Sequence, residues 1–194
     1  MIISISGAQG QGKSTVLAAL KEKNYTVVEN KTARSILSDW GVSLDEVYLD
    51  KPLAQRFHDE ILKRHDEYCE QYYHSEDIAF IERSFADIFS YALAVLGPHN
   101  TYSSWLDSFY ESCKANQAKL SGVMYISGRV YVPEPDGVRS TNKHFSDIID
   151  TSIKRYLKEF SDTSGTHLVY DINYSDRKYR VSAIESVIER YFDV

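Results

Sequence analysis

The sequence predicts a three-layer α/β/α fold built on a parallel sheet of about five strands. Short apolar runs alternate with longer amphipathic segments along the 194 residues, an order that is typical of β-α-β units. A glycine-rich turn also separates the first apolar run from the first amphipathic segment. No internal repeat, low-complexity segment or long linker divides the chain, so residues 1–194 are expected to form one domain.

Five short apolar runs are predicted as strands. The first follows Met1 directly, and the second lies just beyond the first amphipathic segment. The third run is apolar almost throughout, which indicates burial on both faces of a sheet. In order, the predicted strands cover residues 2–6, 25–28, 77–81, 122–126 and 167–170.

Seven longer segments carry apolar residues at helical spacing. The first begins at the glycine-rich turn, and the third places Leu53, Phe57 and Ile61 on roughly one face. The fourth ends at Gly97-Pro98, a pair that stops helices. In order, the predicted helices cover residues 13–23, 31–40, 52–73, 84–96, 102–119, 145–160 and 176–192.

The composition favours a protein that binds a small molecule. The formal net charge is −6, whereas proteins that coat nucleic acids usually carry an excess of basic residues. No run of about 18 consecutive apolar residues occurs, and no basic segment precedes the first apolar run. We therefore expect a cytoplasmic protein that does not enter a membrane.

Residues 7–14, Gly-Ala-Gln-Gly-Gln-Gly-Lys-Ser, fit the phosphate-binding pattern G-x-x-x-x-G-K-[ST]. Glycines let the backbone wrap tightly, so that several N–H groups point at phosphate oxygens, and the following helix adds its positive end. Lys13 is expected to reach the β- and γ-phosphates, and the Ser14 hydroxyl to ligate Mg²⁺. The sequence thus predicts that ATP and Mg²⁺ are bound by Gly7, Gln9, Gly10, Gln11, Gly12, Lys13, Ser14 and Thr15.

Such a loop occurs in GTPases and ATPases as well as in kinases. The chain lacks an N-K-x-D motif that would read guanine, which counts against a GTPase. It also lacks a long hydrophobic strand that ends in an Asp-Glu pair, which counts against a ring-forming ATPase. These two observations favour a kinase of a small acceptor.

Two charged residues follow the second predicted strand, at the sheet edge where open α/β folds bind ligands. Glu29 could act as general base on an acceptor hydroxyl or hold Mg²⁺ through water, or it could be a solvated loop residue. Arg34 lies five residues on and could clamp an acceptor phosphate or ribose, or lie on the surface.

A second motif follows the third predicted strand. Residues 80–84, Phe-Ile-Glu-Arg-Ser, precede a helix and resemble the E-R-S or D-R-S motif of deoxynucleoside kinases and thymidylate kinase-like enzymes. The resemblance implies that Glu82 lies near Mg²⁺ and the 5′ oxygen of the acceptor. It also implies that Arg83 contacts the acceptor or the transferring phosphoryl group. The alternative is a structural ion pair between Glu82 and Arg83, and in either case Ser84 is expected to cap the helix.

Residues 128–144 form an irregular stretch that is predicted as a lid over the donor phosphates, with an ordinary surface loop as the alternative. Arg139 is the candidate that would stabilise the transferred charge. Residues 136–140, Asp-Gly-Val-Arg-Ser, are similar to a stretch found in small P-loop proteins, many of them encoded by bacteriophages. This group resembles the ribosylnicotinamide kinase domain and phage deoxynucleoside monophosphate kinase-like proteins, which implies that Asp136 and Arg139 bind substrate.

Several other residues have an alternative structural interpretation. His58 and His65 stand seven residues apart on the third predicted helix and are predicted to lie on the surface. Arg177 and Arg180 could lie over the donor adenine or on the surface. Five aromatic residues could stack on an acceptor base or pack in the core: Trp40, Tyr48, Phe57, Tyr91 and Trp105.

Three functions follow from these patterns. The leading hypothesis is an ATP-dependent kinase of nucleosides or nucleoside monophosphates, with Lys13, Arg83 and Arg139 stabilising charge and Glu29 as the base for a hydroxyl acceptor. The second is a kinase of hydroxymethylated pyrimidines in phage DNA, which would act in the host cytoplasm. The third is an ATPase or switch without an acceptor. The sequence specifies neither the acceptor nor the oligomeric state, and a homodimer is compatible with it.

Overall fold

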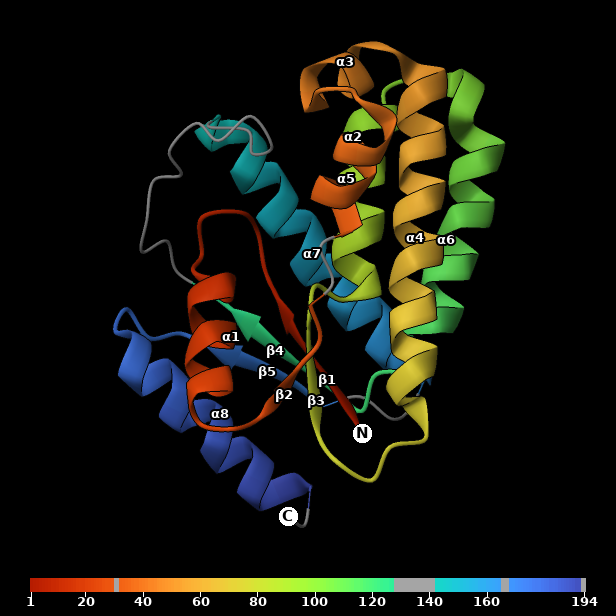
Figure 1. Cartoon of the computed structure of the whole chain (residues 1–194). Coiled ribbons are helices and arrows are strands. Elements are labelled where there is room, and N and C mark those ends of the chain that lie inside the picture. Colours follow the sequence, from red (N-terminus) through yellow and green to blue (C-terminus); the bar gives the residue numbers. More distant parts are fainter. Residues whose placement is uncertain (30–31, 128–141, 165–167, 193–194) are drawn as a thin grey trace.

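A five-stranded parallel sheet lies at the centre of the protein (Figure 1). The computed structural model describes residues 1–29, 32–127, 142–164 and 168–192. The strand order is β2-β3-β1-β4-β5, and each neighbouring pair runs parallel, which confirms the predicted fold class. The strands are β1 (Ile2–Ser6), β2 (Thr26–Val27), β3 (Ala79–Glu82), β4 (Gly122–Ile126) and β5 (Leu168–Ile172).

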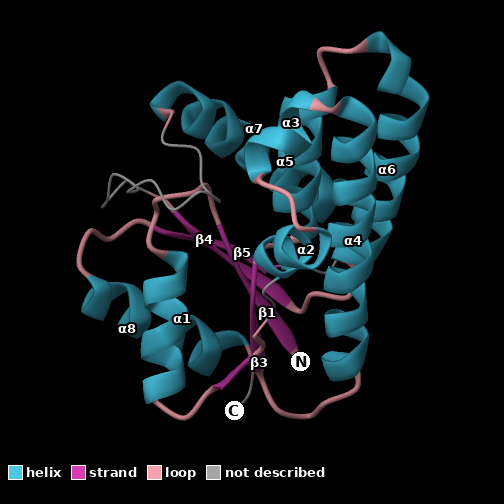
Figure 2. Cartoon of the chain, turned by 45° about the horizontal axis from the view of Figure 1, so that its top comes forward, coloured by secondary structure: helices cyan, strands magenta, loops and turns pink. Residues whose placement is uncertain are grey.

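Helices cover both faces of this sheet. Helices α1 and α8 pack on one face, and α4, α5 and α7 pack on the other, with α6 beside α5 (Figure 1, Figure 2). None of the helices in the described residues is long and apolar enough to cross a bilayer. The helices are α1 (Lys13–Glu22), α2 (Thr32–Trp40), α3 (Leu44–Leu49), α4 (Lys51–Tyr73), α5 (Phe85–Leu96), the short 3-10 helix η1 (Asn100–Tyr102), α6 (Ser103–Gln117), α7 (Lys143–Ser164) and α8 (Arg177–Tyr191).

The strands alternate their side chains between two cores. Ile3 and Ile5 of β1 join the core beneath α1 and α8, whereas Ile2 joins the core beneath α4, α5 and α7. On β4, Met124 joins the core beneath α1 and α8, and Val123 joins the core beneath α4, α5 and α7. Because both faces are buried, the central strands read as continuous apolar runs, which is the pattern that predicted them.

A third core lies beyond the sheet, where α2 and α3 pack on α4 and the end of α5. This cluster holds α2 and α3 above the carboxyl ends of the strands, so that they form one wall of the candidate site. Its buried residues are Ile36, Leu37, Val47, Ala54, Phe57, Val95 and Leu96.

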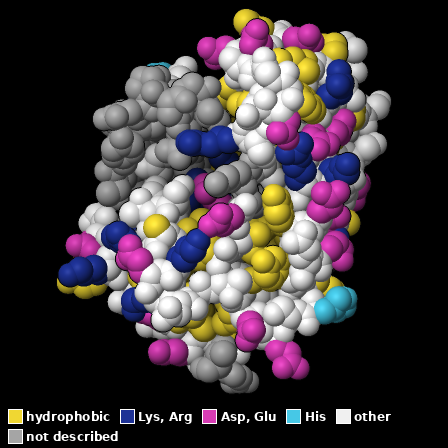
Figure 3. All heavy atoms as spheres, in the orientation of Figure 1, with side chains coloured by type: hydrophobic (Ala, Val, Ile, Leu, Met, Phe, Trp, Pro, Cys, Tyr) yellow, Lys and Arg dark blue, Asp and Glu magenta, His cyan; other side chains and the backbone are white. Residues whose placement is uncertain are grey.

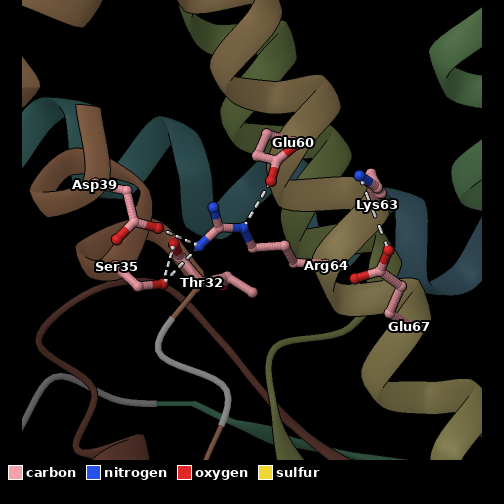
Figure 4. A network of polar contacts seen from close by, with 7 residues as sticks. All are labelled: Thr32, Ser35, Asp39, Glu60, Lys63, Arg64 and Glu67. Atoms are coloured by element: carbon pink, nitrogen blue, oxygen red, sulfur yellow. Dashed lines mark hydrogen bonds and ion pairs between the residues drawn. The ribbon is translucent and has the colours of Figure 1, made fainter.

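A polar network adds to the packing of α2 on α4 (Figure 4). From α4, Arg64 donates to Asp39 of α2 at 2.9 Å and to Ser35 of α2 at 3.2 Å. Its Nε donates at 2.7 Å to Glu60, one turn earlier on its own helix. The hydroxyl of Ser35 in turn donates at 3.1 Å to the backbone carbonyl of Thr32. Arg64 therefore ties α2 to the long helix both at Ser35 and at Asp39, near the end of α2.

Most element boundaries differ by a few residues from the sequence prediction, and two differences matter for the candidate site. Helix α3 was not predicted, and its beginning is fixed by a capping box in which Ser43 accepts from the Glu46 backbone while the Glu46 carboxylate accepts from the Ser43 backbone. Helix α7 begins at Lys143, so the last two residues of the predicted lid belong to a helix. Residues 128–141 of that segment, with Asp136 and Arg139, lie outside the described residues.

Candidate active site

The glycine-rich loop joins β1 to α1 as predicted and is shaped by positive backbone angles. Gly7, Gly10 and Gly12 have φ values of 138°, 81° and 84°, a region that favours glycine. A Cβ atom on Gly7 would lie 2.3 Å from Oε1 of Gln11 and 2.9 Å from the carbonyl oxygen of Ile126. A side chain at position 7 would therefore collide with both neighbours, so the loop needs this glycine.

The loop fits the phosphates of a nucleotide. Helix α1 begins after Gly12, which offers no side-chain cap, and its first turn holds no acidic residue. Its first N–H groups and positive end therefore suit an anion. The buried Nζ atom of Lys13 donates to the carbonyl oxygens of Gly7 at 2.7 Å and Ala8 at 2.9 Å, so the ammonium lies within the loop.

Helix α8 supports the loop from behind. Arg180 is 3% exposed, and its Nη1 donates at 2.5 Å to the carbonyl oxygen of Gln11. Its other nitrogens donate to the carbonyl oxygens of Tyr174 at 2.5 Å and Ser127 at 3.3 Å. Arg180 thus links the loop to the segments that follow β4 and β5. Arg177 instead forms an ion pair with Glu22 at 2.9 Å.

Helix α7 contacts the loop from another side. Ser146 donates to the carbonyl oxygen of Gln9 at 3.3 Å, and the Gln11 amide donates to the Asp150 carboxylate at 2.5 Å. The Tyr125 hydroxyl also donates to Asp150. Burial would raise the pKa of Asp150, but hydrogen bonds from Tyr125, Lys154 and Gln11 lower it overall. Asp150 therefore stays a carboxylate and holds the Gln11 side chain.

The Glu82-Arg83-Ser84 motif lies at the carboxyl end of β3, next to the loop. The Ser14 hydroxyl donates to the Glu82 carboxylate at 3.4 Å, so the two oxygens predicted as Mg²⁺ ligands converge. Serine hydroxyl and carboxylate oxygens are the ligand types that Mg²⁺ prefers, with phosphate oxygens and water completing the shell. The residues present therefore fit a magnesium ion bound to a nucleotide.

Arg83 holds an unusual backbone conformation. Its φ is 75°, and its N–H donates to the carbonyl oxygen of Ile5 at 3.0 Å. The guanidinium lies 4.5 Å from the centroid of the Tyr91 ring, and its buried Nη1 has no hydrogen-bond partner among the described residues. Burial alone would lower the pKa of Arg83, but the groups of Tyr91, Glu82 and Asp87 raise it overall, so Arg83 stays charged.

Asp87 joins the two motifs, although the sequence analysis did not single it out. Its buried carboxylate accepts from the Gly7 backbone at 3.1 Å and from the Ser6 hydroxyl at 2.5 Å. It also accepts from the backbone of Ser84 at 3.0 Å and from its hydroxyl at 2.6 Å. Ser84 caps α5 as predicted, and an acid three residues after a serine is the capping-box pattern that could have revealed Asp87.

A cavity of about 290 Å³ runs from the loop into the helices above the sheet. The loop and Glu82 border one part of it, and apolar and aromatic side chains of five helices border the rest. Phe145 of α7 is a wall residue that the sequence analysis missed. The wall residues beyond the loop are Thr32, Ala33, Leu44, Tyr48, Phe57, His58, Ile61, Arg83, Ile88, Tyr91 and Phe145.

The other aromatic candidates pack elsewhere. Trp40 lies against Phe57 with ring centroids 6.2 Å apart, and Trp105 stacks on Phe109 at 4.6 Å. Neither tryptophan borders the cavity, so of the five aromatic candidates only Tyr48, Phe57 and Tyr91 do so.

Glu29 and Arg34 lie outside the cavity wall. Glu29 is exposed and forms an ion pair with Lys21 at 2.6 Å. Arg34 is exposed on α2, one residue beyond the wall residue Ala33. The structure therefore does not bring these two residues together with Lys13, Glu82 and Arg83.

The prediction that His58 and His65 lie on the surface is wrong, since each is 1% exposed. Burial lowers the pKa of His58 from its usual 6.5 to about 3. Burial, with a smaller contribution from the charge of Arg83, lowers the pKa of His65 to about 3 as well. His65 packs on Phe85 and shares a hydrogen bond with the Arg83 backbone, whereas His58 borders the cavity.

Comparison with known proteins agrees with this geometry. A family model described as an AAA domain matches residues 2–167. No curated protein matches the chain in sequence. Among solved structures, thymidylate kinase from Candida albicans has a TM-score of 0.67 at 14% identity, covering 97% of this chain and 91% of its own. Deoxyadenosine kinase from M. mycoides, solved with bound dATP, has a TM-score of 0.69 at 17% identity, and the match covers 97% of this chain and 100% of that one.

Shikimate kinase from Acinetobacter baumannii is a more distant structural match, with a TM-score of 0.53 at 10% identity. The match covers 98% of this chain and 94% of that one. At these identities the likeness concerns the fold, which is that of small P-loop kinases.

Proposed function

The chain belongs to the family described as an AAA domain, and from that premise we propose that it is an ATP-dependent phosphotransferase acting on a nucleoside or nucleoside monophosphate. One observation carries the proposal. A single cavity is bordered by the phosphate-binding loop in one part and by an apolar, aromatic chamber in another, with Glu82 and Arg83 also on its wall. A protein that only hydrolyses ATP has no need of such a chamber.

The walls of the chamber favour a planar acceptor. Tyr48, Phe57, Tyr91 and Phe145 all border it, and aromatic side chains suit a heteroaromatic ring better than a polyhydroxylated one. The solved thymidylate and deoxyadenosine kinases, which share the fold, support a base-bearing acceptor.

The residues around the loop would share the work of the transfer. An oxygen of the acceptor would bond to the γ-phosphorus as the bond from that phosphorus to the bridging oxygen breaks, leaving ADP. Lys13 and Arg83 would hold the charge on the phosphoryl oxygens, and we propose the same role for Arg139. Ser14 and Glu82 would hold Mg²⁺, which when bound neutralises phosphate charge.

The proton of a hydroxyl acceptor needs a carboxylate. Glu82 borders the cavity and would serve as this base only where it does not hold Mg²⁺, whereas Glu29 is exposed and forms an ion pair with Lys21. Glu29 stays our sequence-based candidate for the base, and Arg34 and Asp136 stay candidates for binding the acceptor. For a phosphate acceptor no base is required.

A transfer assay tests the proposal. Mg-ATP labelled at the γ-phosphate is offered with nucleosides, their monophosphates, ribosylnicotinamide, or DNA with and without hydroxymethyl pyrimidines, and Lys13→Ala is the control. We expect label on a small base-bearing acceptor, lost in the variant. Label confined to DNA would replace this proposal with a DNA kinase, whose binding should weaken steeply with salt. Release of free phosphate that no acceptor changes would indicate an ATPase or switch.

The surface gives a reason to expect a small acceptor. On the face shown in Figure 3, acidic and basic side chains are interspersed, and basic ones do not form a continuous stripe. The net charge of −6 has the same sign as a DNA backbone. Both features suit a free nucleoside or nucleotide better than duplex DNA.

A further inference from the structure

We propose that His58 selects the acceptor by hydrogen-bonding to a polar group on the edge of a planar heteroaromatic base. This inference rests on the proposed function and assigns a specificity-determining residue to its acceptor chamber. The base would present a ring nitrogen, carbonyl or amino group to the imidazole.

The first observation is that His58, a residue of the cavity wall, carries two buried ring nitrogens without partners among the described residues. The side chain is 1% exposed and borders the cavity from α4. Neither Nδ1 nor Nε2 has a hydrogen-bond partner among the described residues. Its nearest ring neighbours are Phe57 at 5.7 Å and Phe109 at 6.5 Å, both apolar. Buried polar side chains nearly always have partners, so an imidazole of this kind points to a ligand that supplies one.

The second observation is the contrast with His65, two turns later on the same helix. His65 is equally buried but does not border the cavity, and its ring shares a hydrogen bond with the Arg83 backbone. Within the described part of the chain, the buried histidine away from the cavity therefore has a hydrogen-bond partner, whereas the one at the cavity has none.

The chemistry of a neutral imidazole defines the ligand class. One ring nitrogen donates and the other accepts, so His58 can meet either an acceptor or a donor on the base. The neighbouring walls are apolar at Phe57, Ile61 and Ile88. Where walls are apolar, the few polar groups decide orientation and selectivity. A ring without hydrogen-bonding groups would leave His58 unpaired and should be a poor acceptor.

The test compares the best acceptor of the transfer assay with an isosteric nucleoside analogue whose ring lacks hydrogen-bonding groups. In the parent, kcat/KM should favour the natural base strongly. His58→Leu should lower kcat/KM for the natural base about 10- to 100-fold and change it within about threefold for the isostere. His58→Gln, which keeps a donor and an acceptor, should recover part of the loss.

Ile61→Val is the matched control, because it removes only apolar contact from the same helix wall. It should lower kcat/KM for both acceptors by a similar factor. An equal loss for both acceptors in His58→Leu would overturn the proposal, since it would assign His58 to packing.

Unfolding of the ligand-free protein gives a second readout, because a ligand-binding role and a structural role of His58 predict opposite shifts of the urea midpoint. If His58 is kept for a ligand, His58→Leu removes an unsatisfied buried group and should move the urea midpoint to a higher concentration. A purely structural histidine would move it to a lower concentration, which would contradict the proposal. Should the leucine variant fail to fold, that outcome also counts against the proposal.

Failure of the proposed function can be told apart from failure of this inference. If no acceptor receives label, calorimetric titration with the four deoxynucleosides and ribosylnicotinamide measures binding alone. Binding to the parent that weakens in His58→Leu and returns in His58→Gln would support the role of His58 without any transfer. Binding that is unaffected by both substitutions would overturn it.

Discussion

Arg83 combines a backbone φ of 75° with a guanidinium stacked on Tyr91 at the cavity wall. Non-glycine residues rarely adopt this conformation, and such strain is found most often where function requires a particular side chain. The backbone N–H bond to Ile5 and the hydrogen bond that His65 shares with the Arg83 backbone hold the residue in place. Arg83 is thus fixed in a rare backbone conformation at the cavity wall.

Replacing the guanidinium while keeping its charge tests this role. Arg83→Lys should lower kcat/KM by about 10- to 100-fold, because an ammonium cannot bind phosphate in a bidentate manner or stack on Tyr91. Arg56→Lys is the matched control, since Arg56 lies over Trp40 at 5.6 Å on the exposed side of α4. Steady-state kinetics measure both. Equal rates in Arg83→Lys and the parent would remove Arg83 from the transfer.

The two buried histidines should make stability depend on pH. Their folded pKa values of about 3 lie below the usual 6.5, so protonation favours the unfolded chain. The contribution of the two neutral histidines to the free energy of unfolding is fully present above about pH 6.5 and declines as the pH falls toward 3. His58→Gln should flatten the fall in unfolding free energy between these values, measured by urea denaturation. His74→Gln, which replaces the exposed histidine at the end of α4, controls for the substitution itself. An unchanged slope of unfolding free energy against pH in His58→Gln would contradict the lowered pKa of His58.

At the level of the element, the beginning of α5 connects the two motifs of the site. Its first turn supplies Asp87, which binds Gly7 of the loop and Ser84 of the Glu82-Arg83-Ser84 motif. The same helix carries Tyr91 and Ile88 into the cavity wall. The position of α5 therefore sets the loop, the arginine and part of the chamber together.

Asp87→Asn should disturb both stability and nucleotide binding. The amide keeps the shape but loses the charge and one acceptor, so the unfolding free energy should fall by about 2–3 kcal/mol. Affinity for an ATP analogue should fall as well, because the Gly7 backbone loses its anchor. Asp45→Asn, an exposed acid in the first turn of α3, should stay within about 0.5 kcal/mol of the parent. A similar stability loss in the two variants would show that Asp87 has no special role.

At the level of the whole molecule, the sequence was enough for the fold class and the loop. The buried strands are nearly continuous apolar runs, and the glycine spacing is typical of a tight turn before a helix. Both features can therefore be recognised from neighbouring residues in the sequence. Strand order follows from tertiary packing and could not be read from local patterns. Helix α3 was missed because its six residues are too short for a periodic signal.

The histidines were misplaced for a related reason. Helix α4 is rich in charged residues, and its buried side is defined by contacts with α5, α6 and the third core, which lie far apart in sequence. Glu29 and Arg34 follow a strand, but the chain after β2 places both away from the cavity wall. Position after a strand therefore indicates the correct edge of the sheet, and the direction of each side chain depends on packing.

The most direct test of the central claim is the fate of the γ-phosphate in a single turnover. Labelled ATP is mixed with excess protein and the best base-bearing acceptor, and label on the acceptor is compared with label released as free phosphate. A phosphotransferase with donor and acceptor in one cavity predicts that most label reaches the acceptor, and that Lys13→Ala abolishes transfer. Label released as free phosphate at the same rate with and without the acceptor would contradict the account.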